Sequence, residues 1–421
     1  MISLLIIALL HLFALLTWRN FQTGVILLTG LLPTYLLRFN IGLIPVTVLE
    51  VMILIVCVIW FLKEKNKDLE WRSVLQNNWL KAIILLLISA TVAVIIAPDK
   101  LGALGIWKAY FVQPILIFLL LQNTLRVKDW RNVFKALASS SLAVSTFAIG
   151  QYLFNFGIPA PWDIERRVTS IFDYPNAVGL FLAPIVGMSL VLLFNAVRAS
   201  RKFEFTKDNI LWLLSIILGF STIILAKTEA ALVAIPTGLI LTFLFSPASQ
   251  KLKLQIFSAS ILAVTFLSFT VPAVREKLFL QDYSGQVRLS QWQETAELLK
   301  HSPALGVGLN SYPTALQAFH DATFYEIFQY PHNIILNIWV ELGLLGLVSF
   351  FWLTSLSIKS ILLSTETDDV AIATIKSTAF GALAIMCVHG LVDVPFFKND
   401  LAVMTLIFLA ALSLTKPEKL S

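Results

Sequence analysis

Two arginines and one histidine have the residue types and positions that could do chemistry. Arg167 lies in the segment 156–175, Arg288 lies in the segment 275–333, and His332 lies at the end of that second segment, where a long apolar run begins. A guanidinium group holds phosphate oxygens through paired hydrogen bonds, and a neutral imidazole accepts a proton near neutral pH. These residues therefore favour a site that binds an anionic substrate and transfers a proton beside it.

Each of these residues also has a purely structural interpretation. Arg166 and Arg167 are adjacent and could instead bind lipid headgroups or lie along the membrane surface. A single histidine at a membrane boundary is commonly a satisfied structural residue. The sequence alone leaves both alternatives open.

Further polar residues fall inside or beside apolar runs. Glu50 and Lys108 each lie within an apolar run, and because charges inside a membrane are costly and usually paired, we expect them to pair with each other, as a structural contact or as a wall of the site. His389 and Asp393 are four residues apart, which places them on one face of a helix, where they could orient a loop, assist proton transfer or act structurally. Lys227 occupies a tight turn between two apolar runs.

No recognised metal or nucleotide motif accompanies these residues. The sequence has no zinc-type His/Cys spacing, no GxSxG elbow, no Walker loop and no dinucleotide fingerprint. We therefore expect chemistry without a metal and without a cofactor.

The composition is that of a membrane protein. The chain has 421 residues, of which 58% are hydrophobic and 13% charged, and its mean hydropathy is +0.83. Ordinary soluble domains are about 45–50% apolar and about 25% charged. These values exclude a soluble enzyme, a disordered chain and a nucleic-acid-binding module, so the net charge of +6 is expected to follow the positive-inside rule.

The apolar runs predict an all-α, polytopic membrane protein with about 12–13 spans. A span needs about 20 apolar residues, with a range of roughly 17–25. The predicted spans are 2–18, 22–37, 43–63, 80–98, 103–122, 133–155, 176–197, 209–226, 229–246, 254–274, 334–362, 377–392 and 399–415. Residues 1–421 thus form a single transmembrane domain, into which the large loop 275–333, with short helices of its own, is inserted.

The distribution of basic residues predicts which side the loops face. Alternate connections carry 20 of the 31 lysines and arginines, and the other connections carry 10. The richer set is expected to face the cytoplasm, so the C-terminus is cytoplasmic and the segments 156–175 and 275–333 are extracytoplasmic.

The motifs together resemble the O-antigen ligase / O-antigen polymerase (Wzy-type) membrane family over residues 160–395. The resemblance rests on an arginine before Pro-Asn, an arginine and tryptophan before Pro-x-x-Gly-x-Gly, His-Asn before Glu-x-Gly-x-x-Gly, and a later His with Asp four residues on. Here these are Arg167 and Pro175-Asn176; Arg288, Trp292, Pro303, Gly306 and Gly308; His332-Asn333, Glu341, Gly343 and Gly346; and His389 and Asp393.

The resemblance implies a GT-C-like glycosyltransferase of the cytoplasmic (inner) membrane. Its members transfer a glycan from an undecaprenyl-pyrophosphate carrier to a hydroxyl of a lipid, glycan or protein acceptor at the outer face, without a metal. On this basis Arg167, Arg288 and His332 are the expected catalytic residues. The candidate substrate-binding residues are Arg166, Asn176, Lys108, Lys227, Asn333, His389 and Asp393.

One position departs from the family pattern. Many members carry an arginine in the turn where this chain has Glu229, two residues after Lys227.

Within the family, ligase and Wzy-type polymerase activities differ in their acceptor. A solute or anion transporter is the alternative of another class, but duplicated halves or helices interrupted at the midplane would then be expected, and the sequence has no internal repeat.

Overall fold

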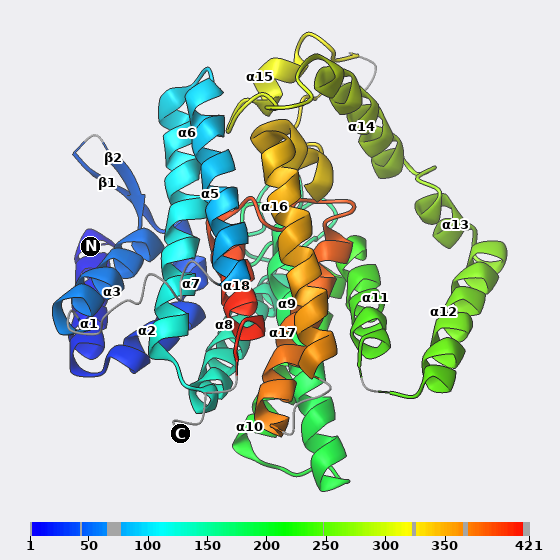
Figure 1. Cartoon of the computed structure of the whole chain (residues 1–421). Helices are drawn as coiled ribbons and strands as arrows, with labels where there is room; N and C mark the ends of the chain where they lie inside the picture. Colours follow the sequence, from blue (N-terminus) through cyan, green and yellow to red (C-terminus); the bar gives the residue numbers. More distant parts are fainter. Residues whose placement is uncertain are drawn as a thin grey trace.

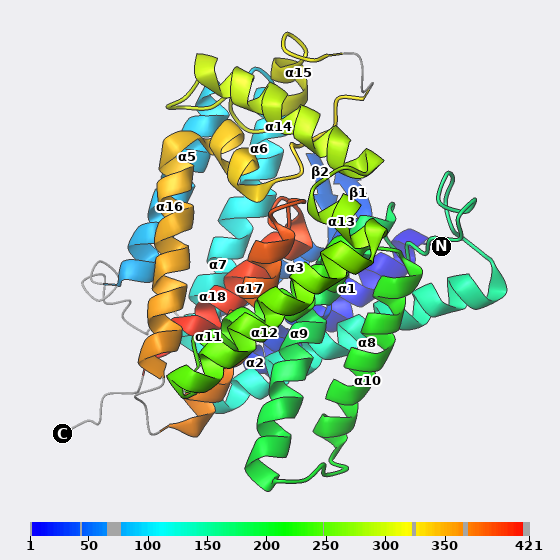
Figure 2. The same ribbon diagram turned by 90° about the vertical axis from the view of Figure 1, so that its right-hand side faces the viewer.

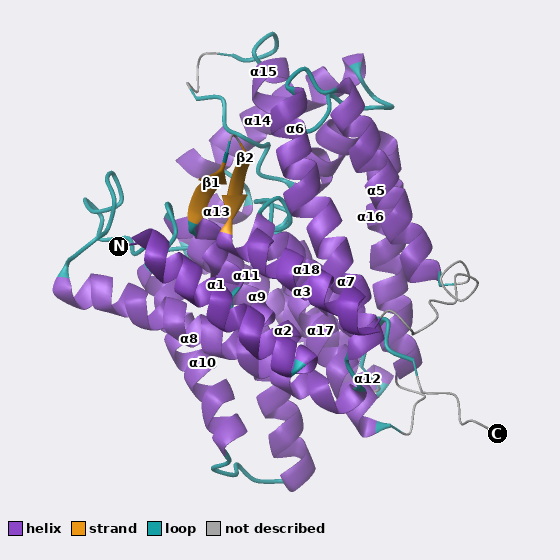
Figure 3. Ribbon diagram, turned by 90° about the vertical axis from the view of Figure 1, so that its left-hand side faces the viewer, coloured by secondary structure: helices purple, strands orange, loops and turns teal. Residues whose placement is uncertain are grey.

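The computed structural model describes residues 2–42, 44–64, 77–246, 248–321, 326–364 and 369–415. Among the predicted spans, only residue 43 falls outside these ranges. Residues 322–325 of the predicted loop 275–333 also lie outside them. Within the described ranges the chain is built almost wholly of helices, and the strands form one short hairpin (Figure 3).

The N-terminal half of the chain contains α1 Ile2–Arg19, α2 Phe21–Gly30, η1 Leu32–Leu36, β1 Arg38–Ile41, β2 Ile44–Thr47, α3 Val48–Glu64, α5 Asn78–Ile96, α6 Lys100–Ile106, the π-helical η2 Trp107–Val112, α7 Gln113–Thr124, η3 Val127–Asp129, α8 Trp130–Phe154 and α9 Pro175–Ser200. The C-terminal half contains α10 Lys207–Leu225, α11 Glu229–Leu244, α12 Gln250–Thr270, α13 Pro272–Leu278, α14 Tyr283–His301, α15 Tyr312–Leu316, α16 Ile334–Ser364, α17 Val370–His389 and α18 Asn399–Leu412.

Within the part of the chain that the structure describes, eight helical stretches are long and apolar enough to cross a membrane. They are α5, α6 to α7, η3 to α8, α9, α10, α12, α16 and α17. Four shorter apolar helices, in α1, α2, α11 and α18, accompany them. The predicted all-α polytopic membrane fold is therefore confirmed.

The predicted span 22–37 is not one helix. α2 ends at Gly30, because Pro33 lacks an N–H and its ring would collide with the preceding helical turn. The chain continues through η1 into the antiparallel pair β1–β2, in which Arg38 pairs with Thr47. The predicted span 43–63 accordingly begins only at Val48, where α3 starts.

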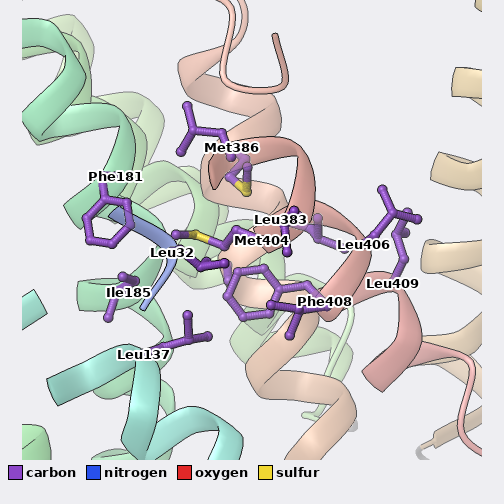
Figure 4. Packing of buried hydrophobic residues seen from close by; sticks show 14 of the residues in the cluster. Leu32, Leu137, Phe181, Ile185, Leu383, Met386, Met404, Leu406, Phe408 and Leu409 are labelled. Carbon is purple, nitrogen blue, oxygen red and sulfur yellow. The ribbon is translucent and has the colours of Figure 1, made fainter. Parts of the chain in front are cut away.

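α9 lies at the centre of the bundle and packs against α8, α10, α11 and α17. The buried cluster in Figure 4 brings Phe181 of α9 near Leu383 of α17 and near Met404 and Phe408 of α18. Each of these side chains is at most 8% exposed. By contrast, α12 stands at the edge of the molecule (Figure 1), and none of its described residues is buried.

The glycine motif of the large loop fastens the loop to a kink in α16. Gly343 has φ +68° inside α16, a backbone conformation that favours glycine. At this kink the N–H of Leu344 donates to the carbonyl of Ala304 at 2.9 Å, and the indole N–H of Trp339 donates to the carbonyl of Pro303 at 2.7 Å. α14 and α15 are thereby held above the first turns of α16 (Figures 1 and 2).

Gly308 fastens the same loop to α5. It has φ +92°, and a β-carbon at this position would lie 2.7 Å from the carbonyl oxygen of Ala93. Leu309 follows and donates its N–H to that same oxygen at 3.3 Å. The Pro-x-x-Gly-x-Gly motif is therefore a docking segment that fixes where α14 lies.

Candidate functional site

Arg167 is held where the loop after α8 meets the turn between α10 and α11. Its Nε donates to the carbonyl of Ala226 at 3.2 Å, and its Nη2 donates to Oδ1 of Asn176 at 3.4 Å. The guanidinium carbon lies 4.9 Å from the ring centroid of Trp162. We call Arg167, Asn176 and Trp162 the arginine cluster.

Asn176 does not cap α9, although asparagine is a preferred N-cap residue. The helix begins at Pro175, its N-cap residue is Tyr174, and Asn176 is the second helical residue. The side chain of Asn176 therefore bonds Arg167 instead of the helix end. This hydrogen bond connects Arg167 to the first turn of α9.

The charged residues around Arg167 differ in burial and in their ion-pair partners. Burial lowers the pKa of Arg167, while the carboxylates of Glu165 and Glu229 raise it. Lys227 lies 3.5 Å from Glu165 in an exposed ion pair, and Glu229 forms an ion pair with Lys277 of α13. Glu229 is thus paired with a lysine that follows α12 at the start of the large loop.

Arg166 faces a different environment from Arg167. Its Nη2 donates to the carbonyl of Tyr152 at 2.7 Å, and its guanidinium stacks 4.7 Å from the centroid of that tyrosine ring. Both contacts hold the loop to the end of α8. The structure therefore separates Arg166 from the groups that contact Arg167.

His332 is held by α14. Its Nδ1 lies 3.1 Å from Oε1 of Gln291, and the indole N–H of Trp292 donates to the carbonyl of Pro331 at 2.9 Å. Because an amide oxygen only accepts, this contact requires the imidazole proton on Nδ1 and leaves Nε2 with its lone pair. His332 also has φ +47°, an uncommon backbone conformation for a residue with a side chain.

The surroundings of His332 favour the neutral imidazole. Burial lowers the pKa of His332, Asp393 raises it, and Arg288 lowers it. A neutral imidazole whose Nε2 is free is the form required of a general base.

Arg288 and Asn333 fasten the loop 390–398 that follows α17. Nε of Arg288 donates to the carbonyl of Val392 at 3.1 Å, and Nδ2 of Asn333 donates to the carbonyl of Leu391 at 3.0 Å. Asn333 also caps α16 by accepting from the N–H groups of Ile335 and Leu336. We call His332, Gln291, Arg288 and Asp393 the histidine cluster.

His389 and Asp393 do not share a helical face. α17 ends at His389, and Asp393 lies in the loop beyond Gly390. Both side chains are nonetheless buried, at 3% and 2% exposed. The position of Asp393 in the histidine cluster is therefore set by the loop after α17 and not by helical spacing from His389.

Two tyrosines connect the arginine cluster with the histidine cluster. The hydroxyl groups of Tyr174 and Tyr330 are 3.2 Å apart. Tyr330 stacks against His332 with 5.0 Å between ring centroids, and Tyr174 is the N-cap residue of the helix that carries Asn176. A continuous series of contacts therefore runs from Arg167 to His332, although a shared cavity for Arg167, Arg288 and His332 stays a prediction.

Lys108 forms the expected pair with Glu50. Its Nζ lies 3.1 Å from Oε1 of Glu50, whose side chain is 7% exposed. The other carboxylate oxygen accepts the N–H of Thr47 at 2.8 Å. The predicted pairing is confirmed, whereas a role for Lys108 in binding substrate stays a prediction.

An apolar cavity of about 390 Å³ lies between α5, α11, α16, α17 and α18. Ile334, two residues after His332, and Phe396, three residues after Asp393, are among its lining residues. Its wall has few polar side chains, and the hydroxyl groups of Thr354 and Ser357 donate to carbonyls of their own helix. An apolar wall of this kind suits a hydrocarbon chain, and Ile334 and Phe396 are the lining residues that lie near the histidine cluster in sequence.

Sequence reasoning missed Gln291, Tyr174, Tyr330 and Lys398. Gln291 is three residues after Arg288, one helical turn further along α14, so helical spacing could have indicated it. The tyrosines and Lys398 meet only through tertiary contacts. Among the described residues, no group of three or more His, Cys, Asp or Glu side chains could hold a metal ion.

These features define a multi-pass membrane protein with an apolar cavity between its helices and a cluster of polar residues that precede or follow the cavity wall in sequence. Residues 214–351 match the family model described as O-antigen ligase, from within α10 to within α16. The match covers about a third of the chain and includes Arg288 and His332 but not Arg167 or Asp393. The resemblance to the O-antigen ligase family, a family of glycan-transferring membrane enzymes, is therefore confirmed, while a comparison with curated proteins finds no match.

Proposed function

We propose that the protein transfers a glycan from an undecaprenyl-pyrophosphate carrier to an acceptor hydroxyl at the outer face of the cytoplasmic membrane, as an O-antigen ligase does. The observation that carries the proposal is the apolar cavity, because Ile334 in its wall follows His332 by two residues and Phe396 belongs to the loop that Arg288 fastens. A donor with a long hydrocarbon tail and a charged head needs an apolar and a polar compartment side by side.

The tail and the head of the donor then have separate partners. The first isoprene units lie in the apolar cavity, and the rest of the chain remains in the bilayer. Arg288 and Arg167 hold the phosphate oxygens, because a guanidinium presents a fork of donors that matches them. Part of each fork is already used by the protein, by Val392 for Arg288 and by Asn176 for Arg167, so both arginines are held in position before substrate arrives.

The reaction is one substitution at the anomeric carbon. Nε2 of His332 takes the proton of the acceptor hydroxyl as its oxygen forms a bond to that carbon. The bond from the anomeric carbon to the phosphate oxygen breaks, and undecaprenyl pyrophosphate leaves with its electron pair. Negative charge grows on the leaving group, and positioned arginines stabilise it more in the transition state than in the ground state.

The proposal is tested with purified protein in lipid nanodiscs and an undecaprenyl-pyrophosphate-linked oligosaccharide. Three acceptors are supplied separately, namely lipid A–core, a second lipid-linked repeat and a serine-containing peptide. Product on lipid A–core supports a ligase, and product only on the second repeat identifies a polymerase instead. No product on any acceptor, with export of a labelled solute from liposomes, would contradict glycan transfer and favour a transporter.

A further inference from the structure

Lys398 occupies a position that lysine normally avoids. It is the N-cap residue of α18, where a side chain ordinarily accepts a hydrogen bond from the first free N–H groups. An ammonium group cannot accept, and its positive charge is repelled by the positive N-terminal end of the helix dipole. Lys398 is therefore expected to lower the stability of the first turn of α18, so its presence there is not explained by helix capping.

Aromatic rings surround this ammonium. Its Nζ lies 4.4 Å from the ring centroid of Tyr174 and 5.8 Å from that of Phe172. Within the described part of the chain, the ammonium of Lys398 forms no ion pair and no hydrogen bond. The residue as a whole is only partly buried.

A second uncapped helix end meets the first at this point. Tyr174 is the N-cap residue of α9 and makes no side-chain cap, and Pro175 follows it. The N-cap residues of α9 and α18 are thus the two partners of the 4.4 Å contact. The ammonium therefore belongs to the first residue of one helix and contacts the side chain at the start of another, and helix N-termini bind phosphate groups elsewhere in proteins.

Nearby acidic residues favour the charged form of Lys398 without forming an ion pair with it, whereas burial opposes that form. Burial lowers the pKa of Lys398 and so does Arg38, while Asp400, Asp393 and Asp173 raise it. Behind the lysine, Oδ1 of Asn399 and Oδ1 of Asp400 are buried and have no hydrogen-bond partner among the described residues. These side chains are 4% and 1% exposed.

We propose that Lys398, together with the N-termini of α9 and α18, binds a phosphate of the polyprenyl diphosphate. The site lies across the Tyr174–Tyr330 contact from His332, so the diphosphate is held between Lys398 and the two arginines. This inference rests on the proposed function. It also supplies a cation in a chain whose Glu229 stands where relatives have an arginine.

The test uses a substitution whose effects on stability and on binding have opposite signs. Lys398→Ser replaces a poor N-cap with a good one, so the melting temperature of the ligand-free protein should rise. Equilibrium binding of undecaprenyl pyrophosphate in nanodiscs should weaken by about 10- to 100-fold, as expected for losing a charged hydrogen bond. Lys398→Arg should retain most of the affinity, and Lys300→Ser, at an exposed lysine of α14, should change neither quantity.

Asn176→Asp provides an independent second variant. A carboxylate at the second residue of α9 favours the helix N-terminus and should raise the melting temperature, but it should repel a phosphate. Wild-type affinity for undecaprenyl pyrophosphate in both Lys398→Ser and Asn176→Asp would overturn the inference and leave the proposed function standing. If the wild-type protein binds undecaprenyl pyrophosphate no better than undecaprenol, the proposed function itself fails.

Discussion

Replacing Gln291 with glutamate should move the acidic limb of the pH–rate profile to higher pH. The amide oxygen of Gln291 lies 3.1 Å from Nδ1 of His332, and a carboxylate there would stabilise the protonated imidazole. An opposite charge within about 4–6 Å raises a histidine pKa by roughly 1–3 units, and each unit corresponds to about 1.4 kcal/mol. Burial already lowers the wild-type pKa of His332 from its ordinary value near 6.5, and Asp393 and Arg288 act equally in both proteins.

The sign of the effect follows from the base role. A raised pKa keeps His332 protonated over a wider pH range, so transfer is lost between the old and new pKa values and is preserved on the alkaline plateau. The assay is the initial rate of glycan transfer between pH 5 and 9. Gln293→Glu adds the same charge two residues further along α14 on an exposed side chain and serves as the control. An unchanged acidic limb in Gln291→Glu would refute the assignment of His332 as the base.

Substitutions at three other residues test the role of Arg288, the backbone conformation at Gly308 and the ion pair of Lys108. Arg288→Gln should lower turnover by roughly 10²–10³, as for other preorganised donors, and Arg288→Lys should recover only part of the loss in the same transfer assay. Gly308→Ala should lower the melting temperature and the activity, because its backbone has φ +92° and lacks space for a β-carbon, whereas Gly105→Ala, where a β-carbon meets nothing within 4 Å, should leave both nearly unchanged. Lys108→Met should destabilise the protein by about 1–3 kcal/mol by leaving a buried carboxylate unpaired, and adding Glu50→Gln should restore much of the stability in a thermal melt.

The overall architecture could be predicted because the membrane imposes a simple rule on composition. Long apolar runs predict membrane-spanning helices, and the motif at His332 lies just before one such run. The same rule failed at the segment 22–37, where Pro33 ends the helix although the composition stays apolar. Hydropathy measures burial in lipid and carries no information on where a backbone turns.

The composition of the candidate site was only partly predictable. Local spacing placed His389 and Asp393 on one helical face, but α17 ends between them, and their proximity comes from the loop that Arg288 holds. The contact of Tyr174 with Tyr330 joins residues that are 156 positions apart. No periodicity encodes such a contact, because it depends on how α9 and α16 are oriented relative to each other.

The contact that Asn176 makes also could not be predicted from local sequence. Asparagine is a strong N-cap by preference, yet here the cap position belongs to Tyr174 and the amide bonds Arg167 instead. A local preference was overridden by a long-range partner. Positions of this kind, where a local rule is broken without a local gain, are where functional contacts are expected.

Donor binding and single-turnover transfer measured side by side in His332→Ala test the central claim most directly. The proposed roles require that the variant bind undecaprenyl-pyrophosphate-linked glycan with wild-type affinity, because the phosphates are held by the arginines. Transfer to the acceptor should fall by roughly 10²–10⁴, the usual contribution of a general base. Transfer at the wild-type rate, or loss of donor binding together with transfer, would contradict the account.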